Sequence, residues 1–280
     1  MKLGIMQGRL VPPEAGRFQS FPRTRWRDEF SLAAAAGLDT IEWIFDEYGE
    51  DANPICTADG VRELRGLSER HGVSIESVCA DWFMDFPLTD PAHGTSGIRW
   101  QRLAWLMHQA ALLQINRIVV PFVDASAIRT PEQVQAVVDG IRPLGDLIDR
   151  TKVELHLETS LSPGEFADLL AHTPHPGVKV NYDSGNSASL GYKPSDEFRA
   201  YGSRVGSVHL KDRRLGAGTV PLGEGSADFD ALFESLAKVR YRGDFILQVA
   251  RGTEGDELEW ARKNSRTARR MIQSLTGDRS

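Results

Sequence analysis

Four side chains that can bind a metal ion or transfer a proton close four apolar segments in the second half of the chain. The segments are VELHLETS, VKVNYDSGN, VGSVHLKDR and FILQVAR. They carry, in order, Glu158, Asp183, His209 and Gln248. Two carboxylates, an imidazole and an amide supply the oxygen and nitrogen donors of a divalent-cation site. Manganese, magnesium, cobalt, zinc or iron would suit such donors, and the sequence does not choose among them.

Alternation of apolar and polar residues places these four side chains on one side of each segment. In the first segment, apolar residues at 153, 155 and 157 alternate with a polar set that ends in Glu158. This pattern predicts strands whose apolar side packs against helices and whose polar side points inward. A single inward carboxylate or amide often belongs only to a hydrogen-bond network. The four together favour a bound cation, because uncompensated buried carboxylates are costly.

The elements that must position these residues extend over the whole chain. Strands are expected at residues 3–6, 38–45, 73–83, 115–124, 153–157, 178–183, 205–212 and 245–250. Helices are expected at residues 26–37, 58–71, 98–113, 130–151, 163–172, 195–201, 229–238 and 257–275. This alternation predicts a parallel sheet. Because no GxGxxG or GxxxxGK[ST] motif supports a doubly wound sheet, we expect one (β/α)8 TIM barrel over residues 1–280, with its chemistry at the strand C-termini.

Three loops are expected around the barrel. Residues 9–25 form a long polar loop, which indicates a role over the barrel mouth. Residues 85–97 form a second loop. The glycine-rich run at 216–225 is compatible with a mobile lid, a backbone anion site or a plain connecting hairpin.

Composition limits the classes of partner. The chain has 280 residues, 41% of them hydrophobic, and a formal net charge of -6. An acidic balance argues against nucleic acid, which requires a basic face. There are two cysteines, no signal-peptide pattern and no run of about eighteen apolar residues, so we expect a cytoplasmic protein without a membrane partner. A homo-oligomer is compatible with this interpretation.

The motifs around these residues resemble those of the xylose-isomerase-like barrel superfamily. They are the spacing of Glu158, Asp183 and His209, the DxxN of Asp183 to Asn186, the HLKD of His209 to Asp212, the LGEG of Leu222 to Gly225 and the IEW of Ile41 to Trp43. That superfamily includes sugar-phosphate isomerases and epimerases, inosose dehydratases and AP endonucleases. The resemblance implies a divalent metal and a small sugar, polyol or sugar-phosphate substrate. The AP-endonuclease branch has a DxH ahead of the LGEG-like loop, where this chain reads GAGTV.

The resemblance also shows where this chain departs from its family. In ketose 3-epimerases, a Glu, an Asp, a His and a second Glu hold the metal, and the two Glu exchange the substrate proton from opposite faces. The matching positions here are Glu158, Asp183, His209 and Gln248. An amide ligates through its oxygen but takes no proton at neutral pH. Asn186 stands where many relatives have His.

Several mechanisms remain open from the sequence. With Glu158 as base, a metal-bound hydroxy-carbonyl compound could be isomerised, epimerised or dehydrated. Lys211 is a candidate acid or electrophile, and its alternative role is to hold Asp183 or Glu158 in place. Glu42 is a candidate hydroxyl binder or alternative base, and its alternative role is a salt bridge inside the barrel. Isomerase or epimerase chemistry is our first expectation, dehydration the second, and a non-catalytic sugar-binding protein the third, which Gln248 favours.

The substrate-binding residues expected from the sequence lie near strand ends. They are Glu42, Asn186, Trp82, Arg9 and Arg213. The two arginines follow strands one and seven, near the end of the barrel that commonly binds phosphate. Trp82 is a candidate to stack on a sugar ring, with core packing as its alternative.

Overall fold

A closed barrel of parallel strands forms the centre of the computed structural model, which describes residues 1–90 and 97–276. The barrel strands are β1 (Leu3–Met6), β2 (Thr40–Ile44), β3 (Ser74–Cys79), β4 (Arg117–Phe122), β5 (Glu154–Thr159), β6 (Val178–Asp183), β7 (Val205–Leu210) and β10 (Phe245–Leu247). Their order around the barrel is β1-β10-β7-β6-β5-β4-β3-β2. The expected (β/α)8 barrel is therefore confirmed.

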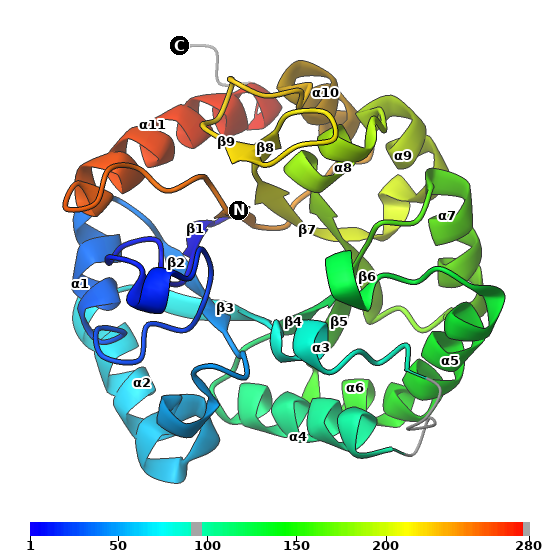
Figure 1. Cartoon of the computed structure of the whole chain (residues 1–280), viewed down its shortest axis with the longest axis horizontal. Helices are drawn as coiled ribbons and strands as arrows, with labels where there is room; N and C mark the ends of the chain where they lie inside the picture. Colours follow the sequence, from blue (N-terminus) through cyan, green and yellow to red (C-terminus); the bar gives the residue numbers. More distant parts are fainter. Residues whose placement is uncertain (91–96, 277–280) are drawn as a thin grey trace.

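Helices surround the barrel as a ring (Figure 1). The ring consists of α1 (Asp28–Ala35), α2 (Ala58–His71), α4 (Ile98–Leu112), α5 (Pro131–Ile141), α6 (Gly145–Thr151), α7 (Pro163–His172), α9 (Pro194–Tyr201), α10 (Phe229–Lys238) and α11 (Glu257–Thr276). Two shorter helices, α3 (Trp82–Asp85) and α8 (Ser184–Leu190), follow β3 and β6 directly. A small antiparallel pair, β8 (Asp212–Arg213) and β9 (Thr219–Val220), follows β7. These last elements lie where the strands end.

Local sequence signals explain where several helices begin and end. Helix α2 begins after Thr57, whose hydroxyl accepts a hydrogen bond from the amide of Gly60 at 3.1 Å. It ends at Gly72, whose φ of 65° lies in the left-handed region. Helix α5 begins with a capping box between Thr130 and Gln133 and has proline at its first turn.

Two expected elements differ from the structure, and one helix was missed. The helix expected at 130–151 is divided into α5 and α6 by a 3-10 turn around Pro143, which has no amide hydrogen to continue the helix. The third strand ends at Cys79 rather than residue 83, and α3 takes up the rest. Helix α8 was not predicted. The expected loop at 85–97 includes residues 91–96, which lie outside the described residues.

For the glycine-rich run at residues 216–225, the sequence is compatible with a lid, an anion site or a hairpin. Part of it pairs as an antiparallel ribbon, with Asp212 opposite Val220 and Arg213 opposite Thr219. The connecting hairpin is therefore the arrangement observed.

The barrel interior is more polar than the branched apolar filling typical of this fold. Buried inward side chains at successive depths include Arg117, His156, Asn181, Ser207 and His209. The apolar partners of the same strands face the helices, as alternation requires. Among the described helices, none is both long enough and apolar enough to cross a lipid bilayer.

Candidate functional site

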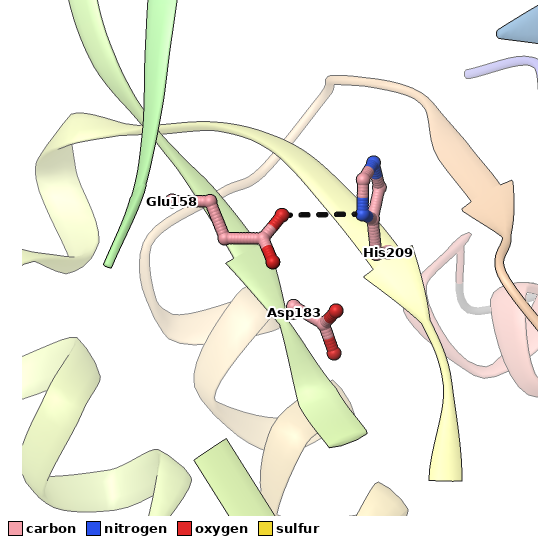
Figure 2. A group of neighbouring side chains, drawn as sticks. All are labelled: Glu158, Asp183 and His209. Carbon is pink, nitrogen blue, oxygen red and sulfur yellow. Dashed lines mark ion pairs between the residues drawn. The ribbon is translucent and has the colours of Figure 1, made fainter. Parts of the chain in front are cut away.

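Glu158, Asp183 and His209 converge at the C-terminal mouth of the barrel (Figure 2). Asp183 and His209 are paired directly across β6 and β7, while Glu158 lies on β5. One donor atom of each residue lies within 4.8 Å of the other two, and all three side chains are buried. The three strand ends thus bring together two carboxylates and one imidazole, as the alternation in the sequence predicted.

The imidazole of His209 is held from behind by Glu42 on β2. Its Nε2 atom lies 2.7 Å from Oε1 of Glu42, and both side chains are fully buried. Burial alone would lower the pKa of His209, but the carboxylates of Glu42 and Glu158 raise it to about 9. Burial raises the pKa of Glu42, but His209 more than offsets this and holds it below its usual value. Glu42 therefore orients the ring and leaves Nδ1 facing Glu158.

Glu158 is positioned by two amides. Asn181 donates to Oε2 at 2.8 Å, and Asn186 donates to Oε1 at 2.6 Å. Burial and the adjacent charge of Asp183 raise the pKa of Glu158 to about 7. A carboxylate with a pKa near neutrality is well suited to take and return a proton.

A hydrogen-bond chain below Glu158 fixes the amide of Asn181. Ser207 donates to its Oδ1 atom at 2.6 Å, and Nδ1 of His156 lies 2.7 Å from the same hydroxyl. The other ring nitrogen of His156 lies 3.0 Å from Glu154. Burial lowers the pKa of His156 to about 4. His156 is thus an interior histidine that contacts Ser207 through one ring nitrogen and Glu154 through the other.

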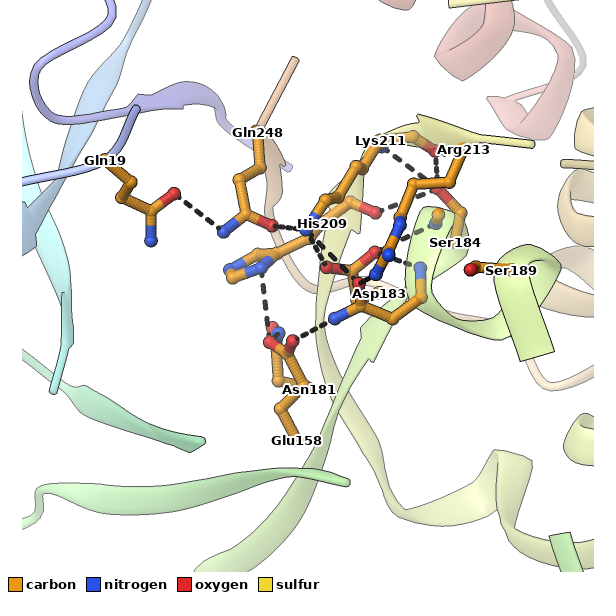
Figure 3. Close-up of polar contacts among 12 residues, drawn as sticks. Gln19, Glu158, Asn181, Asp183, Ser184, Ser189, His209, Lys211, Arg213 and Gln248 are labelled. Atoms are coloured by element: carbon orange, nitrogen blue, oxygen red, sulfur yellow. Dashed lines mark hydrogen bonds and ion pairs between the residues drawn. The ribbon is translucent and has the colours of Figure 1, made fainter. Parts of the chain in front are cut away.

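Lys211 lies close to Asp183 and Gln248 (Figure 3), and it also contacts Asn186. Its ammonium nitrogen is 3.3 Å from Oδ2 of Asp183, 3.3 Å from Oδ1 of Asn186 and 3.2 Å from Oε1 of Gln248. All three donors of the ammonium group therefore have an acceptor. Gly185 provides space for the stem, because a Cβ there would lie 2.6 Å from Cγ of Lys211.

The residues present fit a divalent cation. Nδ1 of His209 is buried and has no hydrogen-bond partner among the described residues, and it lies 3.5 Å from Oε2 of Glu158. An oxygen of Asp183 completes a mixed donor set of the kind that zinc, manganese and related ions accept. Gln248 adds an amide oxygen beside Lys211, on the same mouth. These residues could hold one cation, whose identity they do not determine.

A cavity of about 480 Å³ opens above this site. Its walls include Glu158, Lys211 and Gln248, together with positive charges from Arg17 and Arg213. Segments from both halves of the chain therefore enclose it, including the N-terminal loop that the sequence placed over the mouth. A larger surface groove of about 870 Å³ contains none of the expected metal ligands.

The structure places the expected substrate-binding residues in two groups. Asn186 and Arg213 line the cavity, and NH1 of Arg213 donates to Oδ1 of Asn186 at 2.9 Å. Glu42, Trp82 and Arg9 are not among the described side chains that line it. Trp82 donates to Glu50 at 2.8 Å and stacks on a neighbouring aromatic ring, whereas Glu42 contacts His209.

Arg9 is buried behind the cavity wall, where it holds Gln19 and the backbone of Val249. Its Nε atom donates to the carbonyl oxygen of Val249 at 3.0 Å, and NH2 donates to Gln19 at 3.0 Å. Gln19 in turn lines the cavity with Asp81. Neither Gln19 nor Asp81 was singled out from the sequence. The expected third strand ran to residue 83, but β3 ends at Cys79. With the correct end, Asp81 would follow a strand C-terminus, where barrel enzymes place functional groups.

Fold and site together define a (β/α)8 barrel with an oxygen and nitrogen donor set at its C-terminal mouth. The family described as xylose isomerase-like TIM barrel matches residues 30–274. The chain therefore belongs to the xylose isomerase-like TIM barrel family.

Individual relatives and solved structures are similar over most of the chain. L-ribulose-5-phosphate 3-epimerase UlaE of Salmonella heidelberg (strain SL476) is 26% identical over 237 residues, which cover 80% of this chain and 82% of the relative. The crystal structure of D-psicose 3-epimerase in the presence of D-fructose has a TM-score of 0.73 at 17% identity and covers 99% of this chain and 100% of the other. The IOLI protein with a binding zinc atom has a TM-score of 0.71 at 17% identity, covering 98% of each chain. At such identities, the two structures show the fold alone.

Proposed function

We propose that this protein is a metal-dependent epimerase of ketoses or ketose phosphates, with proton transfer at the carbon next to the carbonyl group. The observation that carries the proposal is the convergence of Glu158, Asp183 and His209 within 4.8 Å beside a cavity of about 480 Å³. The 3-epimerase activities of UlaE and D-psicose 3-epimerase support the reaction class, and the zinc of the IOLI protein supports the metal.

Each residue has a separate task in this reaction. A divalent cation, when bound by Glu158, Asp183 and His209, would stabilise negative charge on the carbonyl oxygen. Glu158 lines the cavity and takes the proton from the adjacent carbon. Asn181 and Asn186 keep its carboxylate in one orientation during this transfer. Lys211 holds Asp183 and adds positive charge beside the developing oxyanion.

A phosphorylated substrate is favoured over a neutral sugar. Arg17, Arg213 and Lys211 line the cavity, and guanidinium groups bind phosphate through paired donors. NH2 of Arg213 has no hydrogen-bond partner among the described residues, since Nε donates to the carbonyl oxygen of Ala217 and NH1 donates to Asn186. A comparison of kcat/KM for L-ribulose 5-phosphate and D-psicose tests this preference. Arg213→Met should lower only the former value if the guanidinium binds phosphate.

The proposal is tested by hydrogen exchange in deuterated water. Purified protein is incubated with Mn²⁺, Mg²⁺, Co²⁺ or Zn²⁺ and with L-ribulose 5-phosphate, D-psicose or D-fructose, and NMR then follows deuterium at C3. We expect label at C3 together with the C3 epimer. Glu158→Gln should reduce the rate at least 100-fold, while the exposed Glu234→Gln on α10 serves as the matched control.

The same experiment separates the alternative functions. Loss of a hydroxyl group with formation of an unsaturated product would identify a dehydratase. Binding of a sugar without exchange at any carbon would identify a non-catalytic sugar-binding protein, the function that Gln248 favours. Either result would overturn the epimerase proposal.

A further inference from the structure

The matched position for a second catalytic carboxylate holds Gln248, yet epimerisation needs a proton donor on the opposite face of the substrate. We propose that Asp81 is that donor, and this inference rests on the epimerase function proposed above. Asp81 lies two residues beyond the end of β3 and lines the same cavity as Glu158. A residue from the first half of the chain would thus replace a carboxylate of the last strand.

The barrel order places Asp81 and Glu158 in different walls of the cavity. In the closed order of strands, β3 lies two positions from β5, which carries Glu158, and four positions from β7, which carries His209. Asp81 and Glu158 both line the cavity. A substrate in this cavity would therefore have a carboxyl group in each of two separate walls.

Asp81 is connected to the position of the missing carboxylate by a single side chain. Gln19 donates to Oδ2 of Asp81 at 2.7 Å and accepts from Nε2 of Gln248 at 3.1 Å. The thiol of Cys79 lies 3.1 Å from the other oxygen of Asp81. Because these partners are neutral, no cation pairs directly with this carboxyl group. Burial raises the pKa of Asp81 above its usual value, which favours the protonated form that can donate.

Other acidic groups of the cavity are less suited to the role. Asp46 accepts backbone hydrogen bonds from Phe21 and Gly49, each at 2.9 Å, so its two oxygens hold loops in place. Asp85 and Asp124 are exposed to solvent. The ammonium group of Lys211 has all three donors engaged on the cation side of the mouth.

The proposed step balances as follows. Glu158 removes the proton from C3, and the electrons of that C–H bond form a carbon–carbon double bond while the carbonyl electrons move onto oxygen. Asp81, as the carboxylic acid, then donates its proton to the opposite face of C3. The electrons of the double bond form the new C–H bond, and the carbonyl group is restored. Glu158 ends protonated and Asp81 ionised, and one proton exchanged with water resets both.

A variant that lacks only the proposed proton donor, Asp81, provides the test. Asp81→Asn keeps the size of the side chain and removes the acidic proton, whereas Asp230→Asn makes the same change at an exposed position of α10 that does not line the cavity. Each protein is incubated with Mn²⁺ in deuterated water, separately with D-psicose and with D-fructose. The same assay is repeated with L-ribulose 5-phosphate and its C3 epimer. Deuterium at C3 and conversion to the epimer are measured independently.

We expect Asp81→Asn to lose at least 100-fold in conversion to the epimer. It should still introduce deuterium into one epimer of each pair, at a rate within about tenfold of the wild type, because Glu158 still removes and returns a proton on its own face. Asp230→Asn should retain both reactions. The deuterium exchange by Asp81→Asn also shows that this variant is folded.

Two results would overturn the assignment of Asp81. One is conversion to the epimer within tenfold of the wild type, and the other is an equal loss of exchange and conversion. If the wild-type protein itself gives no exchange with any of these sugars, the epimerase function fails first and the inference falls with it.

Discussion

The ammonium nitrogen of Lys211 lies 3.2 Å from the side-chain oxygen of Gln248. Together with the contact from Nε2 of Gln248 to Gln19 at 3.1 Å, this fixes which end of the amide points toward the cation site. The oxygen faces Lys211 and Asp183, and the nitrogen faces Gln19 and the chain that leads to Asp81. Gln248 therefore links Lys211, on the cation side of the mouth, to Gln19, which contacts Asp81.

Replacing this amide by a carboxylate should change metal binding. Gln248→Glu adds a negative charge beside Lys211 and Asp183, and we expect the affinity for Mn²⁺ to rise about tenfold because the added carboxylate is a stronger ligand than an amide. Isothermal titration with Mn²⁺ measures the change. Gln248→Met, which removes the amide without adding charge, is the control and should not bind more tightly than the wild type.

The same substitution should rescue the loss of Asp81. In Asp81→Asn with Gln248→Glu, a second carboxylate returns to the matched family position, and conversion of D-psicose to its epimer should recover at least tenfold over Asp81→Asn alone. Chiral chromatography of the products measures the recovery. No gain in the double variant would mean that a carboxylate at residue 248 cannot reach the substrate carbon in this barrel.

The convergence of Glu158, Asp183 and His209 was predictable because strand alternation and barrel closure together determine it. Alternation selects the inward face, and the strand ends select the mouth. Helices with clear caps, such as α2, were also predicted to the residue. The interruption at Pro143 could have been read from proline itself, since a helix interior rarely tolerates it.

The depth of a side chain within the barrel and the position of a loop over its mouth were not predictable in the same way. Alternation placed Glu42 on the inward face but did not indicate that it lies below the cavity, against His209. Gln19 comes from a loop without a repeating pattern, and its place over the mouth depends on contacts with Arg9 and Asp81. Such contacts follow from tertiary packing, for which a single sequence carries no periodic signal.

The role of Glu42 as a positioning residue gives a prediction about metal affinity. Glu42→Gln keeps a partner beside Nε2 of His209 but removes the charge, so we expect the affinity for Zn²⁺ to fall 10- to 100-fold. Competition with a chromogenic chelator measures this affinity. Glu76→Gln on β3, which removes a carboxylate paired with Lys2, is the control and should bind Zn²⁺ as the wild type does. An unchanged affinity in Glu42→Gln would contradict the positioning role.

Asp212 anchors the loop between β9 and α10, as a turn carboxylate. It is fully buried, and its oxygens accept backbone hydrogen bonds from Gly223 at 2.9 Å, Gly225 at 2.9 Å and Ala227 at 3.0 Å. Asp212→Asn weakens this charge-assisted set, and we expect ~2 kcal/mol of local stability to be lost. Limited proteolysis should then cut within residues 214–227.

The β8–β9 hairpin, which begins at Asp212 and continues into this loop, lines the cavity through Gly218 and Thr219. Asp212→Asn should therefore raise KM for L-ribulose 5-phosphate more than it lowers kcat. Asp230→Asn in the first turn of α10 makes the same change nearby and should leave both the cleavage pattern and KM unaltered. Equal cleavage of Asp212→Asn and the wild type would show that the three amides find other partners.

Glu29 makes stability depend on pH. Its Oε1 atom accepts from the amide of Gly8 at 2.7 Å, while Oε2 is buried without a hydrogen-bond partner among the described residues. Burial raises the pKa of Glu29 from 4.5 to about 8. Because the folded state binds the proton more tightly than the unfolded state, the contribution of Glu29 to folding stability is complete below pH 4.5 and is lost as pH rises toward 8.

Glu29→Gln removes this titration, so the stability of the variant relative to the wild type should rise by as much as ~1.4 kcal/mol per pH unit across that window. Urea unfolding at several pH values measures the difference, with the exposed Glu234→Gln as control, and a difference independent of pH would mean that Glu29 is ionised in the folded protein.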